Sequence, residues 1–120
     1  MARPPALERR ILEILWRGGP RSVREVLDEA GGALAYTTIA TVLDRLHDKG
    51  KVSREKEGVA WKYRAARSRE EAVAAEVGRV MRRVGASEPL LVAFLDEVEQ
   101  VEPEALDRLE ALIRARRERQ

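Results

Sequence analysis

Several residue types are scarce in this chain of 120 residues, which has no cysteine and a single histidine. Without cysteine, the chain has neither a disulfide framework nor a thiolate metal site. His47 alone cannot supply a histidine-rich zinc site or the usual nucleophile–base pairs of enzymes. A phosphate-binding loop is missing as well, because Gly18-Gly19 and Gly31-Gly32 lack the required spacing and the lysine that follows it. We therefore expect no enzymatic activity, no bound metal and no cofactor.

Long apolar runs are also missing. The sequence contains no window of about 18 apolar residues that could cross a membrane. Met1 is not followed by the basic and apolar segments of a signal peptide. With no disulfides to form, a reducing compartment is the simplest setting. The expectation is a soluble protein in the cytoplasm, without membrane insertion.

Charge is divided unevenly along the chain. Residues 1–66 contain 13 Lys or Arg against 9 Asp or Glu, a net charge of +4. Residues 67–120 contain 10 against 12, a net charge of −2. Opposite signs of this kind are expected if one half binds a polyanion and the other does not.

Three helices are predicted in the first fifty residues. Apolar residues at helical spacing mark the first helix over residues 7–15, before the break at residues 18–20. Ser22 and Glu25 form a capping box, in which each side chain satisfies the backbone N–H of the other residue, and open the second helix. The stretch YTTIATVLDRLHDKG is the third helix, closed by Gly50.

From residue 51 the apolar pattern changes to the alternation of a β-hairpin. Two runs, VSREK and VAWKYR, flank a turn at Glu57 and Gly58, where glycine can adopt a positive φ. Trp61 and Tyr63 are expected to pack this hairpin against the helices, because an isolated hairpin is only marginally stable. The order of three helices and a hairpin predicts a winged helix-turn-helix.

Residues 67–120 are predicted to be helical and to form a dimerisation module. Ser68 with Glu71 forms a second capping box, Ser87 can cap the next helix, and Pro103 suits the first turn of the last one. The apolar stripes of these helices exceed what three short helices can bury on one another, so a second copy of the chain is expected to cover them. The predicted dimer contacts are Val77, Val80, Leu91, Phe94, Leu95, Leu106, Leu109, Leu112 and Ile113.

The third helix carries an unusual outer surface, which opens with three hydroxyls followed by a guanidinium. Small hydroxyl side chains at a helix N-terminus allow the backbone to approach phosphates, and the free N–H groups there favour an anion. A recognition helix lies in the major groove of DNA, and a wing can contact the flanking backbone. The predicted DNA contacts are Thr37, Thr38, Thr41 and Arg45 on the helix, and Arg54, Lys56 and Lys62 on the wing.

Each of these residues also has a plainer interpretation. Thr37 or Thr38 could simply cap the helix, and Arg45 could pair with Asp44 or Asp48. Cations on a hairpin edge also discourage aggregation. Taken together, in the order of three helices and a hairpin, these residues favour DNA binding over the separate roles. The alternative from another functional class is an adaptor that uses a winged helix for protein contacts without binding DNA.

Three segments together resemble the penicillinase repressor family (BlaI/MecI): LERRILEILWRGGPRSVREVL, AYTTIATVLDRLHDKGKVSREKEG and WKYRAARSREE. The resemblance is strong over residues 7–71 and follows the helix pattern thereafter. It implies a dimeric transcriptional repressor with an N-terminal winged helix and a C-terminal helical dimerisation region, bound to a palindromic operator. By the same resemblance, Thr37, Thr38, Thr41 and Arg45 occupy the positions that face DNA.

The resemblance also implies a route of release. Family members leave their operators when a membrane sensor–protease pathway cleaves them in the C-terminal part, and in the antibiotic-resistance members the cleaved bond precedes a Phe. Phe94 matches that Phe, whereas Ala93 stands where those members have Asn. Ala93–Phe94 is thus the candidate cleavage site and a sensor protease a candidate partner. Copper-responsive relatives carry a Cys-rich metal site, which the absence of cysteine excludes here.

The predictions combine into a mainly α-helical protein with a small β-hairpin. Residues 1–66 are expected to form a winged-helix DNA-binding domain, and residues 67–120 a helical dimerisation module. The expected function is sequence-specific repression of transcription by a homodimer on a palindromic DNA operator.

Overall fold

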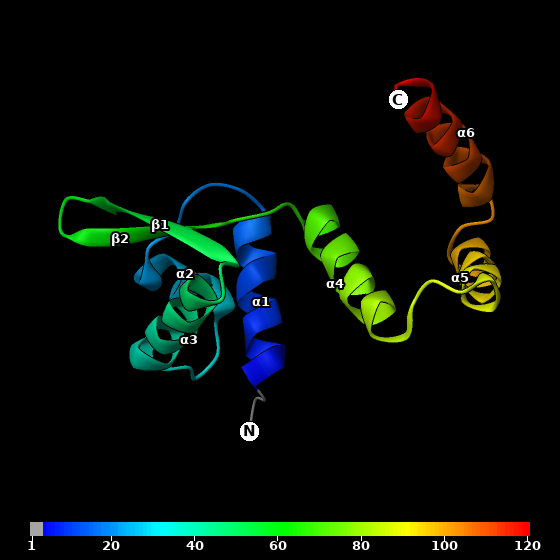
Figure 1. Cartoon of the computed structure of the whole chain (residues 1–120). Helices are drawn as coiled ribbons and strands as arrows, with labels where there is room; N and C mark the ends of the chain where they lie inside the picture. Colours follow the sequence, from blue (N-terminus) through cyan, green and yellow to red (C-terminus); the bar gives the residue numbers. More distant parts are fainter. Residues whose placement is uncertain (1–3) are drawn as a thin grey trace. The chain divides into compact units, whose positions relative to one another are not determined.

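The computed structural model describes residues 4–120, so residues 1–3 of the predicted first domain lie outside the described part. The described chain contains six helices and one two-stranded sheet (Figure 1). In chain order these elements are α1 (Pro4–Trp16), α2 (Val23–Ala30), α3 (Tyr36–Asp48), β1 (Val52–Glu57), β2 (Ala60–Ala65), α4 (Arg69–Val84), α5 (Glu88–Val101) and α6 (Ala105–Glu118). The predicted class, mainly α with a winged helix-turn-helix, is confirmed.

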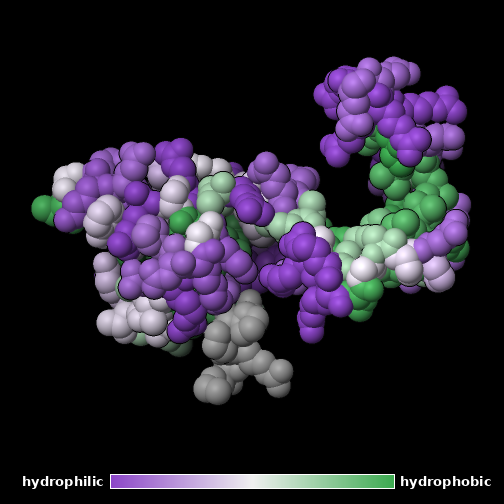
Figure 2. All heavy atoms as spheres, viewed as in Figure 1, coloured by the Kyte–Doolittle hydropathy of each residue, from purple (hydrophilic) through white to green (hydrophobic). Residues whose placement is uncertain are grey.

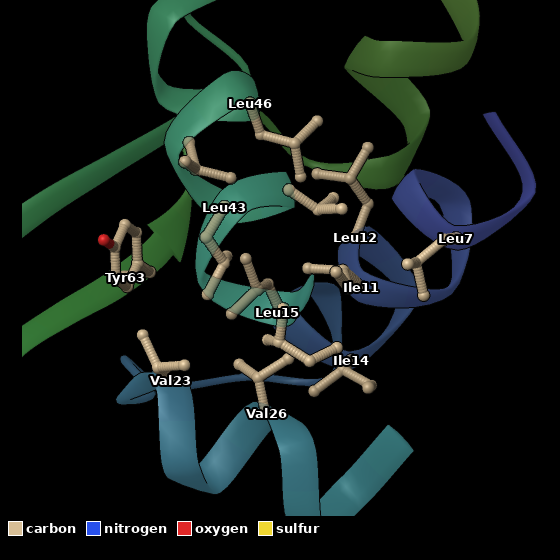
Figure 3. Packing of buried hydrophobic residues seen from close by; sticks show 13 residues of the cluster. Leu7, Ile11, Leu12, Ile14, Leu15, Val23, Val26, Leu43, Leu46 and Tyr63 are labelled. Atoms are coloured by element: carbon tan, nitrogen blue, oxygen red, sulfur yellow. The ribbon is translucent and has the colours of Figure 1, made fainter. Parts of the chain in front are cut away.

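The hydrophobic core lies between the first three helices and the base of the hairpin. Its side chains come from one stripe of each helix, and Figure 3 shows them converging from α1, α2 and α3. The largest fully enclosed members are Ile11, Val26, Ile39, Leu43 and Leu46. Burying one such side chain contributes about 1.5–3 kcal/mol. This cluster therefore holds the three helices together and determines which face of α3 points outward.

Local hydrogen bonds set the helix boundaries. Before α2, the Glu25 N–H donates to Ser22 Oγ at 3.1 Å, and the Ser22 N–H donates to a Glu25 carboxylate oxygen at 2.9 Å. Ser68 and Glu71 make the equivalent pair of bonds, at 3.0 and 2.9 Å, so both predicted capping boxes are confirmed. Ser87 caps α5 by accepting a backbone N–H at 3.3 Å. These bonds satisfy N–H groups that a helix start otherwise leaves without a partner.

The hairpin is joined to the helical part by a short third segment. The strands β1 and β2 pair antiparallel along their whole length. Arg21 extends this pairing, because its N–H donates to the Tyr63 carbonyl at 2.8 Å and its carbonyl accepts from the Tyr63 N–H at 2.7 Å. The Tyr63 side chain is buried in the core, which confirms the expected packing of that residue.

The hairpin turn is displaced by one residue from its predicted position. Glu57 belongs to β1, so the turn lies at Gly58 and Val59. Gly58 has a φ of +65°, a left-handed conformation that glycine adopts without steric cost. Val59 is 96% exposed and does not take part in the strand alternation predicted for it.

Two compact units divide the described chain, the first ending at Glu76 and the second spanning Val77–Gln120. The division falls inside α4, whose first turns belong to the first unit. There, Arg69 forms an ion pair with α1, and Trp16 Nε1 donates to the Arg67 carbonyl at 3.0 Å. The division into a DNA-binding domain and a dimerisation module concerns function and remains a prediction.

The helices of the second unit bury little of their apolar surface. No residue of α4, α5 or α6, all of which the structure describes, is buried. Figure 2 shows hydrophobic residues gathered at the surface over α5. The apolar stripes of these helices are thus exposed or partly exposed in the single chain. Pro103 lies in the turn before α6 rather than in its first helical turn.

Candidate nucleic-acid interface

The N-terminus of α3 is open to solvent. Its N-cap residue is Ala35, and no side chain caps its first turn. The capping interpretation of Thr37 and Thr38 is therefore wrong. Both residues are exposed, as is Thr41 one turn further on. Three small hydroxyl side chains thus lie in the first two turns of a helix whose N-terminal backbone N–H groups and dipole favour an anion.

The outward stripe of α3 follows from its buried side. With four apolar residues turned into the core, the opposite side of the helix carries Thr37, Thr41, Asp44 and Asp48 at successive turns. All four are exposed. The stripe begins with hydroxyls and ends with carboxylates, which sequence reasoning considered only as alternative partners of Arg45.

Arg45 lies beside this stripe, next to α1. Its Nη1 atom is 4.0 Å from a carboxylate oxygen of Glu8, whose side chain is only 10% exposed. Lys49 Nζ binds the same oxygen at 2.9 Å. The alternative pairing of Arg45 with Asp44 or Asp48 is therefore wrong. Glu8 therefore helps to position the Arg45 guanidinium. Because 41% of the Arg45 side chain remains exposed, this group is still accessible to a ligand.

An ion pair connects the wing to the outward stripe. Arg54 of β1 donates from Nη1 to Asp44 Oδ1 at 3.0 Å, and its guanidinium carbon lies 4.6 Å from the centroid of the Trp61 ring. Lys56 Nζ is 5.2 Å from the same centroid. Cations at this range are attracted by the face of an indole. The wing therefore presents two cations on an aromatic support.

The packing expected for Trp61 is wrong, because this side chain is 39% exposed. Trp61 and Tyr63 are two residues apart and share one side of β2. Tyr63 lies at the base of the hairpin and reaches the core, whereas Trp61 lies nearer the tip, where the hairpin extends past the helices (Figure 1). Trp61 meets cations there instead of apolar side chains.

Lys62, the third predicted wing cation, is bound to α2. Its Nζ atom donates to Glu25 Oε1 at 2.7 Å. This bond, followed by the hydrogen bond from the Ser22 backbone, lowers the pKa of Glu25 from 4.5 to about 2. The same pair raises the pKa of Lys62. Lys62 thus ties the wing to the helix, and a phosphate would have to compete with Glu25 for it.

The residues predicted for dimerisation lie in the exposed apolar surface of the second unit. Val80, Leu91, Phe94, Leu95, Leu112 and Ile113 are between 37% and 66% exposed. The remaining members, Val77, Leu106 and Leu109, are partly exposed. The candidate cleavage site, Ala93 and Phe94, is accessible within the helical turns of α5.

Sequence reasoning missed the acidic residues that hold the predicted cations. Glu8 is buried. The only sequence feature that indicates its burial is its position between the apolar residues Leu7 and Ile11 of the first helix. Asp44 is signalled by its place on the same stripe as the threonines. Glu25 was identified for its cap alone, and nothing in the sequence points to its bond with the wing.

Within residues 4–120, no three His, Cys, Asp or Glu side chains gather in a way that could hold a metal ion. None of the helices in the same range is long and apolar enough to cross a membrane. The hydroxyls, guanidinium groups and wing cations around α3 are the groups that proteins use to contact DNA phosphates and base edges.

This fold and this surface define a winged helix-turn-helix regulator of transcription. The sequence profile described as penicillinase repressor matches residues 5–115, and the chain belongs to that family. Relatives from two strains of Mycobacterium tuberculosis, each named transcriptional regulator BlaI, are 35% identical over 115 residues. The aligned part covers 91% of this chain and 83% of each relative. These relatives are regulators rather than enzymes, so the non-enzymatic class is confirmed.

Solved structures of regulators are also similar. A homodimeric winged helix-turn-helix DNA-binding domain from Mycobacterium bovis is 25% identical, with a TM-score of 0.48, over 67% of this chain and 76% of that one. An ArsR-like transcriptional regulator from Rhodococcus sp. RHA1 is 23% identical, with a TM-score of 0.47, over 80% of this chain and 81% of that one.

Proposed function

We propose that the protein is a transcriptional repressor that binds double-stranded DNA with sequence specificity. The observation that carries this proposal is the accessible N-terminal part of α3, where Thr37, Thr38 and Thr41 stand exposed near Arg45. An α-helix fits the major groove of B-DNA, where base edges can be distinguished. The hydroxyls and the free N–H groups contact phosphates, and Arg45 donates to a guanine edge or to a phosphate. Such a repressor acts on chromosomal DNA in the cytoplasm.

The wing contacts the DNA backbone beside the groove. Lys56 and Arg54 approach it from the surface of Trp61, whose ring face attracts both cations. Lys62 contributes a third contact by exchanging Glu25 for a phosphate. Each neutralised phosphate releases counterions, so these contacts supply affinity that depends on salt rather than on sequence.

A homodimer on a palindromic operator is the second part of the proposal. It is supported by the exposed apolar stripes of the second unit, since contiguous apolar surface on a monomer is a liability that an interface removes. A two-fold partner covers the same surface on both chains. The two recognition helices then enter successive major grooves about 34–36 Å apart, or a multiple of that distance.

Proteolytic release is the third part. We propose that a sensor protease cuts between Ala93 and Phe94, which requires the exposed turns of α5 to unwind. The cut separates the apolar stripe of α6 from that of α4 and uncouples the two DNA-binding halves, each of which binds with only single-site affinity. Mass spectrometry of the protein from induced cells should detect a fragment ending at Ala93. Intact protein alone, under conditions that relieve repression, would argue against this route.

DNA binding itself is tested by gel shift with the promoter region of the protein's own gene over a series of salt concentrations. The logarithm of the association constant should fall linearly and steeply with the logarithm of salt concentration. Unrelated DNA of the same length is the control and should compete poorly. The rival function, an adaptor for protein contacts alone, predicts no salt-sensitive complex, and that result would refute the repressor.

A further inference from the structure

An acidic residue on the DNA-facing stripe of α3 is not explained by phosphate contacts. Asp44 follows Thr37 and Thr41 along the same stripe, and its side chain is 64% exposed. DNA phosphates repel a carboxylate, so a surface adapted only to the charge of DNA would not carry an aspartate at this position. A carboxylate that faces the groove needs a hydrogen-bond donor on a base.

Arg54 determines where the Asp44 carboxylate points. Its Nη1 atom donates to Asp44 Oδ1 at 3.0 Å, and the guanidinium stacks 4.6 Å from the Trp61 centroid, with only 25% of the Arg54 side chain exposed. A planar guanidinium held by stacking is pre-organised and loses little further freedom when it forms hydrogen bonds. Asp44 Oδ1 is thus held from the wing, which leaves Oδ2 to accept from a group outside the chain.

We propose that Asp44 is a specificity-determining residue that reads a cytosine in each operator half-site. This inference rests on the proposed DNA-binding function. Asp44 accepts a hydrogen bond from the N4 amino group, which is the donor that cytosine presents in the major groove. Guanine presents the acceptors N7 and O6, and adenine presents an acceptor beside its amino group, so both disfavour a carboxylate.

Arg54 acts as a positioning residue for this contact. A guanidinium has five N–H donors, so it can hold Asp44 with one and still present others to a phosphate. Its positive charge beside Asp44 also reduces the repulsion between the carboxylate and the DNA backbone. The pair therefore combines base recognition by α3 with backbone contact by the wing.

The experiment is selection from a randomised DNA library with the full-length protein and its Asp44→Ala, Asp44→Asn and Asp107→Asn variants. The wild type should select a motif with cytosine at one position of each half-site. Asp44→Ala should lose that preference by about 5- to 150-fold and keep the rest of the motif. Asp44→Asn should prefer adenine there, because Asn makes paired bonds to adenine N6 and N7. Asp107→Asn, at an exposed position of α6 outside the DNA-facing stripe, is the matched control and should select the wild-type motif.

The role of Arg54 is tested in the same selection with Arg54→Lys. This variant keeps the positive charge but loses the planar fork and the indole stacking geometry. The preference for cytosine should weaken, while the salt dependence of binding stays that of the wild type. Full retention of the cytosine preference would show that Arg54 does not position Asp44.

The possible outcomes separate this inference from the proposed function. If both Asp44 variants select the wild-type motif, Asp44 does not read a base. Uniformly tighter binding would then mean that Asp44 is only a solvated charge that repels DNA. Uniformly weaker binding would mean that Asp44 only holds Arg54 and the wing in place. A wild type that selects no motif would refute the proposed function itself and this inference with it. Circular dichroism of each variant controls for folding.

Discussion

At the scale of single residues, the candidate DNA contacts are held by partners on other elements. Glu8 of α1 holds Arg45 of α3 and Lys49, the residue that follows α3, and Asp44 holds Arg54 of the wing. Side chains fixed in this way lose less conformational freedom when they bind, which improves affinity. The acidic partners of Arg45 and Arg54 are therefore part of how the surface recognises DNA.

Replacing Arg45 and replacing Lys56 are expected to affect DNA binding in different ways. Arg45→Ala should cost about 1–3 kcal/mol on the best DNA site and relax the preference at one position, if its guanidinium donates to a guanine edge. Lys56→Ala should weaken binding to all sequences alike and reduce the salt slope by about one unit. Binding isotherms on specific and random DNA over a salt series measure both. Equal losses on every sequence for the two variants would make Arg45 a phosphate contact only.

The Glu25–Lys62 pair predicts a pH dependence of stability. Because the Lys62 bond and the Ser22 backbone bond lower the pKa of Glu25 to about 2, its ionised form stabilises the folded state above the unfolded pKa of 4.5. That contribution is lost as pH falls from 4.5 towards 2. Glu25→Gln keeps an acceptor for the Ser22 N–H and removes the charge.

The measurement is the free energy of unfolding of the wild type and of Glu25→Gln as pH is lowered. The wild type should be the more stable protein at pH 6, and the difference should shrink between pH 4.5 and about 2. Subtracting one curve from the other removes the titration of the other carboxylates. A difference that does not change with pH would mean that the ion pair contributes nothing to the docking of the wing.

At the scale of elements, the two units should respond differently to the loss of an apolar side chain. Leu43 is fully enclosed, so Leu43→Ala should destabilise the winged helix by about 2–5 kcal/mol. Leu112 of the second unit is 66% exposed, and Leu112→Ala should leave the stability of the winged helix unchanged. Denaturant unfolding followed by tryptophan fluorescence reports on the first unit, since Trp16 and Trp61 both lie there. Similar losses for both variants would contradict this division.

The elements themselves were largely predictable because their signals are local. Apolar spacing marks the buried stripes, and the serines at positions 22, 68 and 87 accept backbone N–H groups three residues ahead. The hairpin turn was misplaced by one residue, since alternation continues through Val59 even though glycine sets the turn. The class of fold followed from the order of the elements.

The contacts between elements were not predictable to the same degree. Lys62 and Glu25 are 37 residues apart in sequence, and no local pattern indicates that they meet. The exposure of Trp61 depends on how far the hairpin extends past the helices, which strand alternation does not encode. The candidate DNA contacts lie at exposed or partly exposed positions of α3 and the wing, and their role stays a prediction. Their acidic partners depend on tertiary packing.

At the scale of the whole molecule, the proposed dimer depends on the apolar stripes of the second unit. Leu109→Glu places a charge in the stripe of α6 and should give monomers that keep a folded winged helix but lose the tight operator complex. Ala111→Glu adds the same charge at an exposed position outside the stripe and is the matched control. Sedimentation and gel shift measure the two effects. A Leu109→Glu protein that stays dimeric and binds normally would place the interface elsewhere.

Footprinting of the full-length protein on the promoter region of its own gene tests whether the protein is a two-fold repressor that reads DNA through α3. Two protected half-sites related by two-fold symmetry are predicted, with centres about 34–36 Å apart or a multiple of that distance. Protection should disappear as salt is raised, because phosphate contacts by the wing supply much of the affinity. The absence of protection at any protein concentration in low salt, or a single unsymmetrical footprint, would contradict the account.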